Sequence, residues 1–227
     1  MCPFGRYRAS DRGGGQRYGI LASMASPASS QAPRSELAAV VAAAGDLGVE
    51  CAAYAGLLRR HRVSLYERGM VIRRGGSVLT FRWENVRIYR IMAGRSGFFV
   101  LSKVRYRYRF VAPAGASGKV GPRFPHLREW LPAVQSAVLS ARLPAAVAVA
   151  SAGGVVAFGP VALTAREVRV RSKAAPWSAV KRVKITPGYL HILVHQGRSF
   201  SVSLSRIPND FLLLELARQL APAVRVG

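Results

Sequence analysis

The sequence predicts an α+β protein built from two similar units, each a small antiparallel β-sheet, or partly open barrel, closed by a C-terminal α-helix. In both halves of the chain, short strand-like segments precede one helix-like segment. A segment with tryptophan and valine three residues apart occurs in each half. Half of the 227 residues are hydrophobic, with nine Phe, eight Tyr and three Trp, so the chain can bury a core.

Two segments precede the predicted units. Residues 1–34 are rich in Gly, Ser, Ala and Arg, carry three consecutive glycines at 13–15 and show no hydrophobic period, which predicts a disordered basic tail. Residues 35–62 are rich in alanine, with apolar side chains at Leu37, Val40 and Val41 and again at Tyr54, Leu57 and Leu58. This spacing predicts a helical segment that is interrupted around 45–48.

The first unit is expected over residues 63–143. The segments SLYERGMVIRR, SVLTFRWENVRIYRI and FFVLSKVRYRYRF alternate in polarity and are rich in Val, Ile, Tyr and Phe, as strands are. Glycines, Gly69, Gly75 and Gly94 among them, mark the expected turns. The segment HLREWLPAVQSAVLSARL predicts a helix, and Pro132 predicts either its kink or its start.

The second unit is expected over residues 147–222. VVAFGPVALTAREVRVR, PWSAVKRVKI, YLHILVHQ and RSFSVSLS predict short strands, and NDFLLLELARQL predicts a helix with Leu212, Leu216 and Leu220 on its inner face. Residues 143–165 carry no charge and are long enough to cross a bilayer. Their Gly-Gly pair at 153–154 and Pro160 instead favour the end of a helix, a turn and two short strands.

The two units share a register. Trp83 and Val86 recur as Trp177 and Val180, 94 residues later. At the same offset Arg87 corresponds to Lys181, Arg90 to Lys184 and Ile91 to Ile185. A period this long indicates a duplicated domain rather than a solenoid.

These segments resemble known families. A W-x-x-V turn that leads into an amphipathic strand, within a small sheet closed by a helix, resembles bacterial pleckstrin-homology-like (PH-like) domains. The segments LYERGMVIRRGG, LTFRW, WLPAVQSAVLSARLP, FGPVALT, PWSAV and IPNDFLLLELARQL resemble an uncharacterised actinobacterial family with two such units in tandem, over about residues 46–222. The resemblance implies a fold and carries no activity with it. The first unit departs from it in having Arg82 where the second has Pro176.

Charge points to anionic partners. The chain has 34 Lys and Arg against 10 Asp and Glu, a formal net charge of +24. A GC-rich genome would favour arginine over lysine, but it would not by itself make acids scarce. The surplus predicts contact with an anionic lipid surface, a nucleic acid or a protein partner. Residues 63–143 hold 15 basic and 3 acidic residues and 147–222 hold 10 and 3, so the first unit is the stronger candidate.

The candidate site residues are basic residues on predicted strands. In RYRYRF a strand places Arg105, Arg107 and Arg109 on one face, about 7 Å apart, where they could contact phosphates or lipid headgroups. The alternative is the solvated face of a half-buried sheet. The pairs Arg87 and Arg90, and Lys181 and Lys184, place similar charge on the corresponding strand of each unit.

Nothing in the sequence predicts catalysis. The ten acids are scattered, and no nucleophile, phosphate-binding loop or metal-ligand motif is present. His191 and His195 on one strand would lie about 13 Å apart, too far to share a metal. Cys2 and Cys51 form no CxxC pair. We therefore expect no catalytic residue, cofactor, metal or small-molecule substrate.

The expected function is binding. We expect a non-enzymatic, cytoplasmic PH-like binding or adaptor protein that contacts an anionic membrane surface or a protein partner through its basic strands. The alternative is a nucleic-acid-binding protein that uses the same strands. That alternative requires Tyr106 and Tyr108 to be exposed for base stacking.

Overall fold

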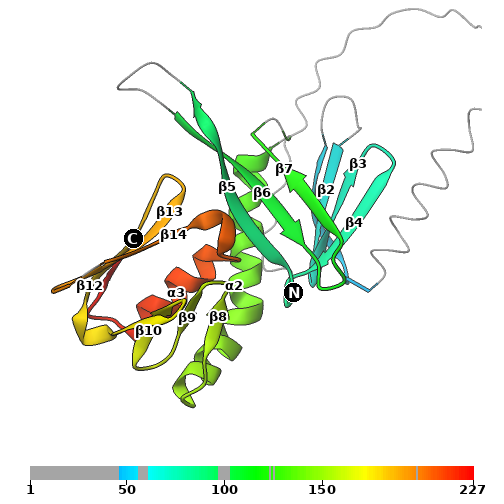
Figure 1. Ribbon diagram of the computed structural model, residues 1–227. Helices are drawn as coiled ribbons and strands as arrows, with labels where there is room; N and C mark the ends of the chain where they lie inside the picture. Colours follow the sequence, from blue (N-terminus) through cyan, green and yellow to red (C-terminus); the bar gives the residue numbers. More distant parts are fainter. Residues whose placement is uncertain (1–45, 56–60, 97–102, 123, 125, 198) are drawn as a thin grey trace, which may run out of the picture.

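The computed structural model describes residues 46–55, 61–96, 103–122, 124, 126–197 and 199–227. This part of the chain is mixed α+β, with four mostly antiparallel sheets and two α-helices. None of these four sheets closes into a barrel. Two sheets lie on each side of a long central helix, as Figure 1 shows.

The first half consists of two sheets. One contains β1 (Glu50–Ala55), β2 (His61–Tyr66), β3 (Gly69–Arg74) and β4 (Ser77–Arg82), paired in that order. The other contains β5 (Arg87–Ser96), β6 (Lys103–Val111) and β7 (Ser117–Val120). Every pairing in both sheets is antiparallel, because each strand follows its neighbour through a short connection.

The second half repeats this order of elements, and most of its strands are shorter. Its first sheet contains β8 (Val156–Phe158), β9 (Val161–Leu163), β10 (Glu167–Val170) and β11 (Lys173–Pro176). After the 3₁₀ turn η3 (Trp177–Ala179), the second sheet contains β12 (Val180–Thr186), β13 (Tyr189–Val194) and β14 (Phe200–Ser203). Next come η4 (Leu204–Arg206), the helix α3 (Asp210–Leu220) and β15 (Arg225–Val226), which pairs in parallel with β12.

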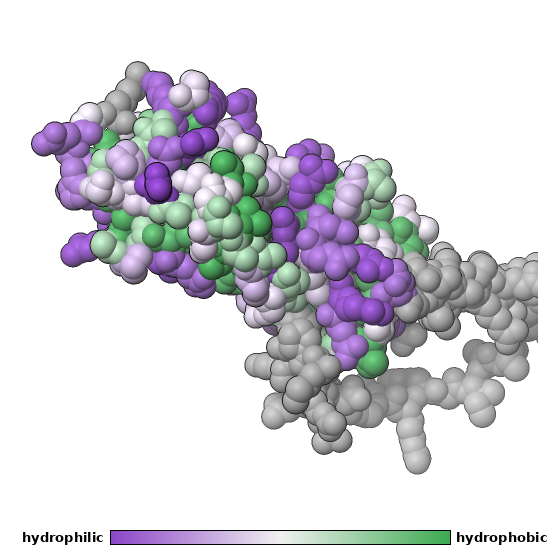
Figure 2. Space-filling model, turned by 90° about the horizontal axis from the view of Figure 1, so that it is seen from below, coloured by the Kyte–Doolittle hydropathy of each residue, from purple (hydrophilic) through white to green (hydrophobic). Residues whose placement is uncertain are grey.

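The helix α2 (Leu127–Ser151) joins the two halves. Trp130, Val134 and Val138 are buried in the core of the first half, and Leu143 and Val147, further along the helix, pack against the core of the second. One helix therefore contributes hydrophobic side chains to both cores. In the described part of the chain, α2 is also the one helix whose length and composition would allow it to cross a membrane. Figure 2, a view of the molecule from below, shows hydrophobic patches between hydrophilic regions of its surface.

The paired tryptophans occupy matching positions. Trp83 and Trp177 are both buried and each follows the fourth strand of its half. The indole of Trp83 donates a hydrogen bond to the Tyr66 carbonyl (3.1 Å), and that of Trp177 donates one to the Thr164 carbonyl (3.0 Å). Each indole N–H needs a partner once it is buried, and a carbonyl on the second strand, or just after it, supplies one.

Buried polar contacts hold the halves together. Asn209, 2% exposed, directly precedes α3. Its amide oxygen accepts from the Ile88 N–H (2.9 Å) and its amide nitrogen donates to the Val86 carbonyl (3.0 Å). Arg90 of β5 forms an ion pair with Asp210, which is 3% exposed. The second half therefore caps the edge of β5 with side chains.

Several predictions are corrected. Residues 50–55 were expected to be helical and form β1, because Ala52 and Tyr54 pack on the first core and the backbone pairs with β2. The first sheet thus begins at Glu50 rather than at 63, α2 extends to Ser151, and strands of the second half extend to Val226. Gly94 makes a bulge within β5 instead of a turn. Pro132 lies inside α2 and does not mark its start.

Two other predictions are confirmed, and two concern residues outside the described part of the chain. The uncharged stretch 143–165 forms the end of α2, a turn and the strands β8 and β9, as predicted. Leu212 and Leu216 of α3 are buried, and Leu220 is partly buried against the same core. The tail 1–34 and the segment 35–45 lie outside the described residues.

Candidate anion-binding site

A basic hollow lies at one end of the first half, with a volume of about 620 Å³. It is formed where the start of β2 and the end of β3 meet the second sheet and the connection from β7 to α2. Its charged and aromatic lining residues are His61, Arg74, Arg105, Arg107, Lys119 and Phe124. Among the described residues, no acidic side chain lines it.

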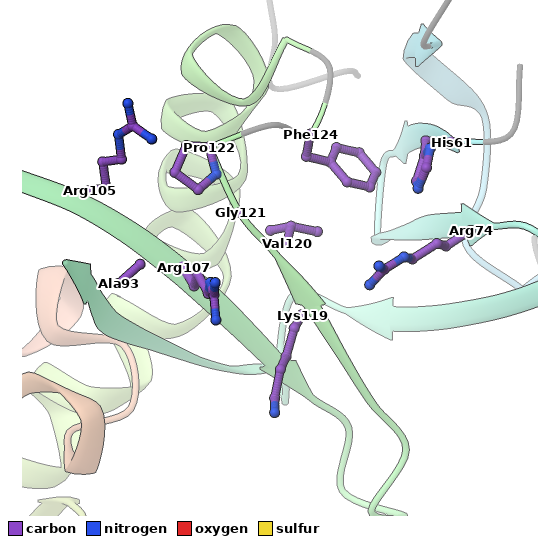
Figure 3. Close-up of a pocket in the computed structure, with 10 residues that line it drawn as sticks. All are labelled: His61, Arg74, Ala93, Arg105, Arg107, Lys119, Val120, Gly121, Pro122 and Phe124. Atoms are coloured by element: carbon purple, nitrogen blue, oxygen red, sulfur yellow. The ribbon is translucent and has the colours of Figure 1, made fainter. Parts of the chain in front are cut away.

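The pleat of the strands sets the direction of the cations. In β6, Phe110 is fully buried and Tyr108 half-buried, so Arg105 and Arg107, an odd number of residues away, are exposed on the other face. In β7, Val120 faces the core and Lys119 faces outward. Figure 3 shows Arg107 and Lys119 extending from neighbouring strands, with Arg74 reaching toward them from β3.

The positive charges of the hollow are not neutralised within the described part of the chain. There, none of Arg74, Arg105, Arg107 and Lys119 forms an ion pair. Arg109 of β6 is moreover directly opposite Lys119 of β7. Like charges in facing positions destabilise an antiparallel pair. The fold therefore concentrates positive charge here, and the repulsion between these cations lowers its stability. An anionic ligand would reduce that repulsion.

One wall of the hollow is aromatic. The rings of His61 and Phe124 meet edge to face with centroids 5.4 Å apart, and Phe124 also packs against Trp130 of α2 (6.0 Å). Figure 3 shows both rings on the side of Arg74. The wall is thus fixed to the core, while the cations lie on strands that face it.

The sequence matches the model of a family of unknown function, DUF6585, over residues 36–225, most of the chain. The chain belongs to the DUF6585 family. Comparison with curated proteins gives no match. Membership of an uncharacterised family is thereby confirmed, while PH-like units in tandem and an actinobacterial origin stay predictions.

This DUF6585 member brings only some of the predicted site residues together. Arg105 and Arg107 line the hollow. Arg109 lies beside it with its guanidinium carbon 4.7 Å from the centroid of the Tyr89 ring, an attractive cation–π contact. Arg87 is exposed at the start of β5. Arg90 pairs with Asp210 and lies 5.4 Å from the Tyr106 ring centroid, so it holds the two halves together and does not line the hollow.

The lysines predicted in the second half lie on another sheet. Lys181 is exposed on β12, and Lys184 is half-buried opposite His191 of β13. The His191 ring is held between the hydroxyls of Thr186 (2.7 Å) and Ser201 (2.8 Å). Among the described residues, no group of three or more His, Cys, Asp or Glu is placed to hold a metal ion.

Sequence reasoning missed four lining residues. His61, Arg74, Lys119 and Phe124 come from separate segments, and only the pairing of the strands brings them together. The Arg73-Arg74 pair before Gly75 was a usable signal, since it ends a strand with two cations at a tight turn.

Burial shifts the pKa of two groups near Arg90, where the two halves meet. Desolvation raises the pKa of the Tyr108 phenol, and the nearby Arg90 opposes that rise. Desolvation also raises the pKa of the Asp210 carboxyl, again against the effect of Arg90. Tyr108 is therefore a packed side chain of the β5–β7 sheet and is not exposed for stacking, contrary to what the nucleic-acid alternative required.

Proposed function

We propose that this protein is a non-enzymatic binding protein that contacts anionic membrane surfaces through the hollow of its first half. The two halves, each with four strands, three further strands and a helix, are interpreted as PH-like units in tandem. Under this proposal the protein is cytoplasmic and peripheral to the membrane, and it acts as an adaptor.

The hollow is the observation that carries the proposal. Four cations without acidic partners among the described residues line one open depression, and one of them, Lys119, lies directly opposite a fifth cation, Arg109. Each Lys or Arg near an anionic bilayer contributes about 1 kcal/mol to binding. Arginine also suits phosphate oxygens, because its planar group donates two parallel hydrogen bonds.

The nucleic-acid alternative has weaker support. It relied on exposed rings at Tyr106 and Tyr108, whereas Tyr106 lies next to the Arg90 guanidinium and Tyr108 packs on the core. Phe124 and His61 are ring-bearing residues in the hollow, but they contact each other edge to face. A base would have to separate them before it could stack between them.

The test is sedimentation with vesicles of phosphatidylglycerol and phosphatidylcholine. The variant R74S/R105S/R107S/K119S removes the four cations of the hollow. The matched control R166S/R169S/R206S/R218S also removes four positive charges, from exposed positions of the second half. We expect the hollow variant to bind on the order of 10²–10³-fold more weakly than the wild type, and the control to lose less than about tenfold.

Two results would overturn the proposal. One is equal weakening by the hollow variant and the control, which would make the binding a property of net charge alone. The other is no vesicle binding at low salt together with binding of duplex DNA whose affinity falls linearly on a log–log plot against salt. The second result would establish the nucleic-acid alternative instead.

A further inference from the structure

A second basic hollow lies in the other half. Its volume is about 430 Å³, and it lies where the β10–β11 turn meets the start of β14. Its lining residues are Val170, Arg171, Ser172, Lys173, Ser199, Phe200 and Ser201. Two cations and three hydroxyls thus face one depression without an acidic side chain, and neither cation has an ion-pair partner among the described residues.

The backbone of the β10–β11 turn is strained at Arg171. β3 and β4 are joined by a two-residue turn, Gly75-Gly76, and β10 and β11 by a turn of the same length, Arg171-Ser172. The first turn residue has φ 58° in Gly75 and φ 55° in Arg171. This left-handed conformation is unfavourable for a residue that bears a side chain, and glycine avoids the strain.

The strained arginine has no structural use for its side chain in the described part of the chain. Its backbone N–H donates to the Pro160 carbonyl (2.8 Å), a bond that glycine would make equally well. The guanidinium is exposed at the rim of the hollow beside Lys173. Backbone strain that persists without a packing reason points to a binding role for the side chain.

The serines complete an oxyanion site. Ser201 of β14 shares a hydrogen bond with His191 Nδ1 (2.8 Å), which fixes the orientation of its hydroxyl. The Ser199 hydroxyl accepts weakly from the Val194 N–H (3.4 Å), so its own proton is available to a ligand. Two cations and hydroxyl donors on one rim match the oxygens of a phosphate group.

We propose that the second hollow binds a phosphate group through Arg171, Lys173 and the hydroxyls of Ser172 and Ser199. The site is separate from the first hollow, so it does not depend on the function proposed for that hollow. A chain with both sites would hold two phosphate groups at once, and binding to a surface that presents many of them would be strengthened by avidity.

The test is an NMR titration of the full chain with inorganic phosphate, following backbone amides of both hollows. We expect saturable shifts at residues 170–173 and 199–201. R171G/K173S should weaken this binding by roughly tenfold, whereas R169S/R206S, which removes the same charge from exposed positions of the same half, should leave it nearly unchanged.

Thermal unfolding separates a lost ligand contact from a damaged fold. Because R171G relieves the strain of the turn, it should keep the midpoint of thermal unfolding or raise it, by up to about 2–4 °C. If phosphate binding weakens and the R171G midpoint is not lowered, the weaker binding results from the loss of the arginine side chain and not from a damaged fold. A lower midpoint for R171G would contradict the claim that the turn is strained without a packing reason.

The outcomes separate the two sites. Phosphate shifts confined to the first hollow would overturn the second site and leave the proposed function standing. Shifts at residues 170–173 without vesicle binding would do the reverse. Equal weakening by R171G/K173S and R169S/R206S would also contradict the second site, since binding would then follow net charge.

Discussion

At the scale of single residues, Arg90 and Asn209 decide how the halves meet. Both were read from sequence in other roles: Arg90 as a surface cation, and Asn209 as part of the start of α3. The helix does begin at Asp210, yet the Asn209 side chain makes no cap and instead bonds to Val86 and Ile88, more than a hundred residues away. Residues so far apart in the sequence share no local pattern, so the sequence alone could not identify these hydrogen-bond partners.

Replacement of Arg90 by alanine should destabilise the protein strongly. The change leaves the Asp210 carboxylate buried without its cation, and breaking a buried pair in this way costs about 3–5 kcal/mol. The measurement is chemical denaturation at neutral pH. Arg87→Ala on the same strand is the control, since Arg87 is exposed and its loss should change stability by less than about 0.5 kcal/mol. Similar losses in both variants would contradict the structural role of Arg90.

Tyr108 should make stability depend on pH in the alkaline range. Burial raises its pKa in the folded state above the usual value of about 10, so the folded protein holds the phenolic proton more tightly than the unfolded chain does. Its contribution is therefore complete below the unfolded-state pKa and is lost as the pH rises through the folded-state value. Compared with Tyr108→Phe, the wild type should lose stability as the pH rises above about 10. An unchanged difference across that range would contradict the burial of the phenol.

At the scale of elements, alternation in polarity predicted most of the strands, and the predicted antiparallel sheets are present. RYRYRF is the clearest case, since its tyrosines and phenylalanine turn inward and its arginines outward as expected. The failure at β1 has a physical reason. ECAAYA has high helix propensity through its alanines, but pairing with β2 and burial of Tyr54 against the core override that local preference.

The helix α2 contains an interior proline that lowers its stability. Pro144 lies in its interior and is exposed, so it removes a backbone hydrogen bond without contributing to a core. Pro144→Ala should therefore raise the unfolding free energy by about 1–3 kcal/mol in thermal or chemical denaturation. The neighbouring exposed Ala145→Gly should lower it by about 1 kcal/mol. A destabilised Pro144→Ala protein would mean that a bend at this residue is needed for the helix to reach both cores.

At the scale of the whole molecule, the two halves are joined by shared packing. The helix α2 contributes to both cores, and Asn209 and Asp210 of the second half satisfy groups on β5 of the first. We therefore expect one cooperative unfolding transition. The variant W177F keeps the tryptophans of the first core and W83F/W130F keeps that of the second, so their fluorescence reports on one half each.

The check is chemical denaturation of both variants, followed by fluorescence and by far-UV circular dichroism. In each variant the midpoints from the two signals should coincide, because unfolding of one half removes packing from the other. A fluorescence midpoint that differs from the circular dichroism midpoint would show that the halves unfold independently.

Charge was the whole-molecule property that sequence revealed most plainly, and it was also the least specific. A net charge of +24 indicated anionic partners but gave no location for them. The first hollow takes Arg105 and Arg107 from one strand and Arg74 and Lys119 from two others, so only the arrangement of two sheets makes them one site. The same arrangement sends Arg90 inward and places Lys184 in another sheet.

The central claim is that the first hollow, rather than total charge, contacts an anionic membrane. The most direct measurement is NMR of the arginine side-chain Nε–H groups as bicelles containing phosphatidylglycerol are added to the wild type. We predict that the signals of Arg74, Arg105 and Arg107 shift together and saturate, while those of Arg166, Arg169 and Arg218 stay in place. Uniform small shifts across all six arginines, or unmoved signals from the first three, would contradict it.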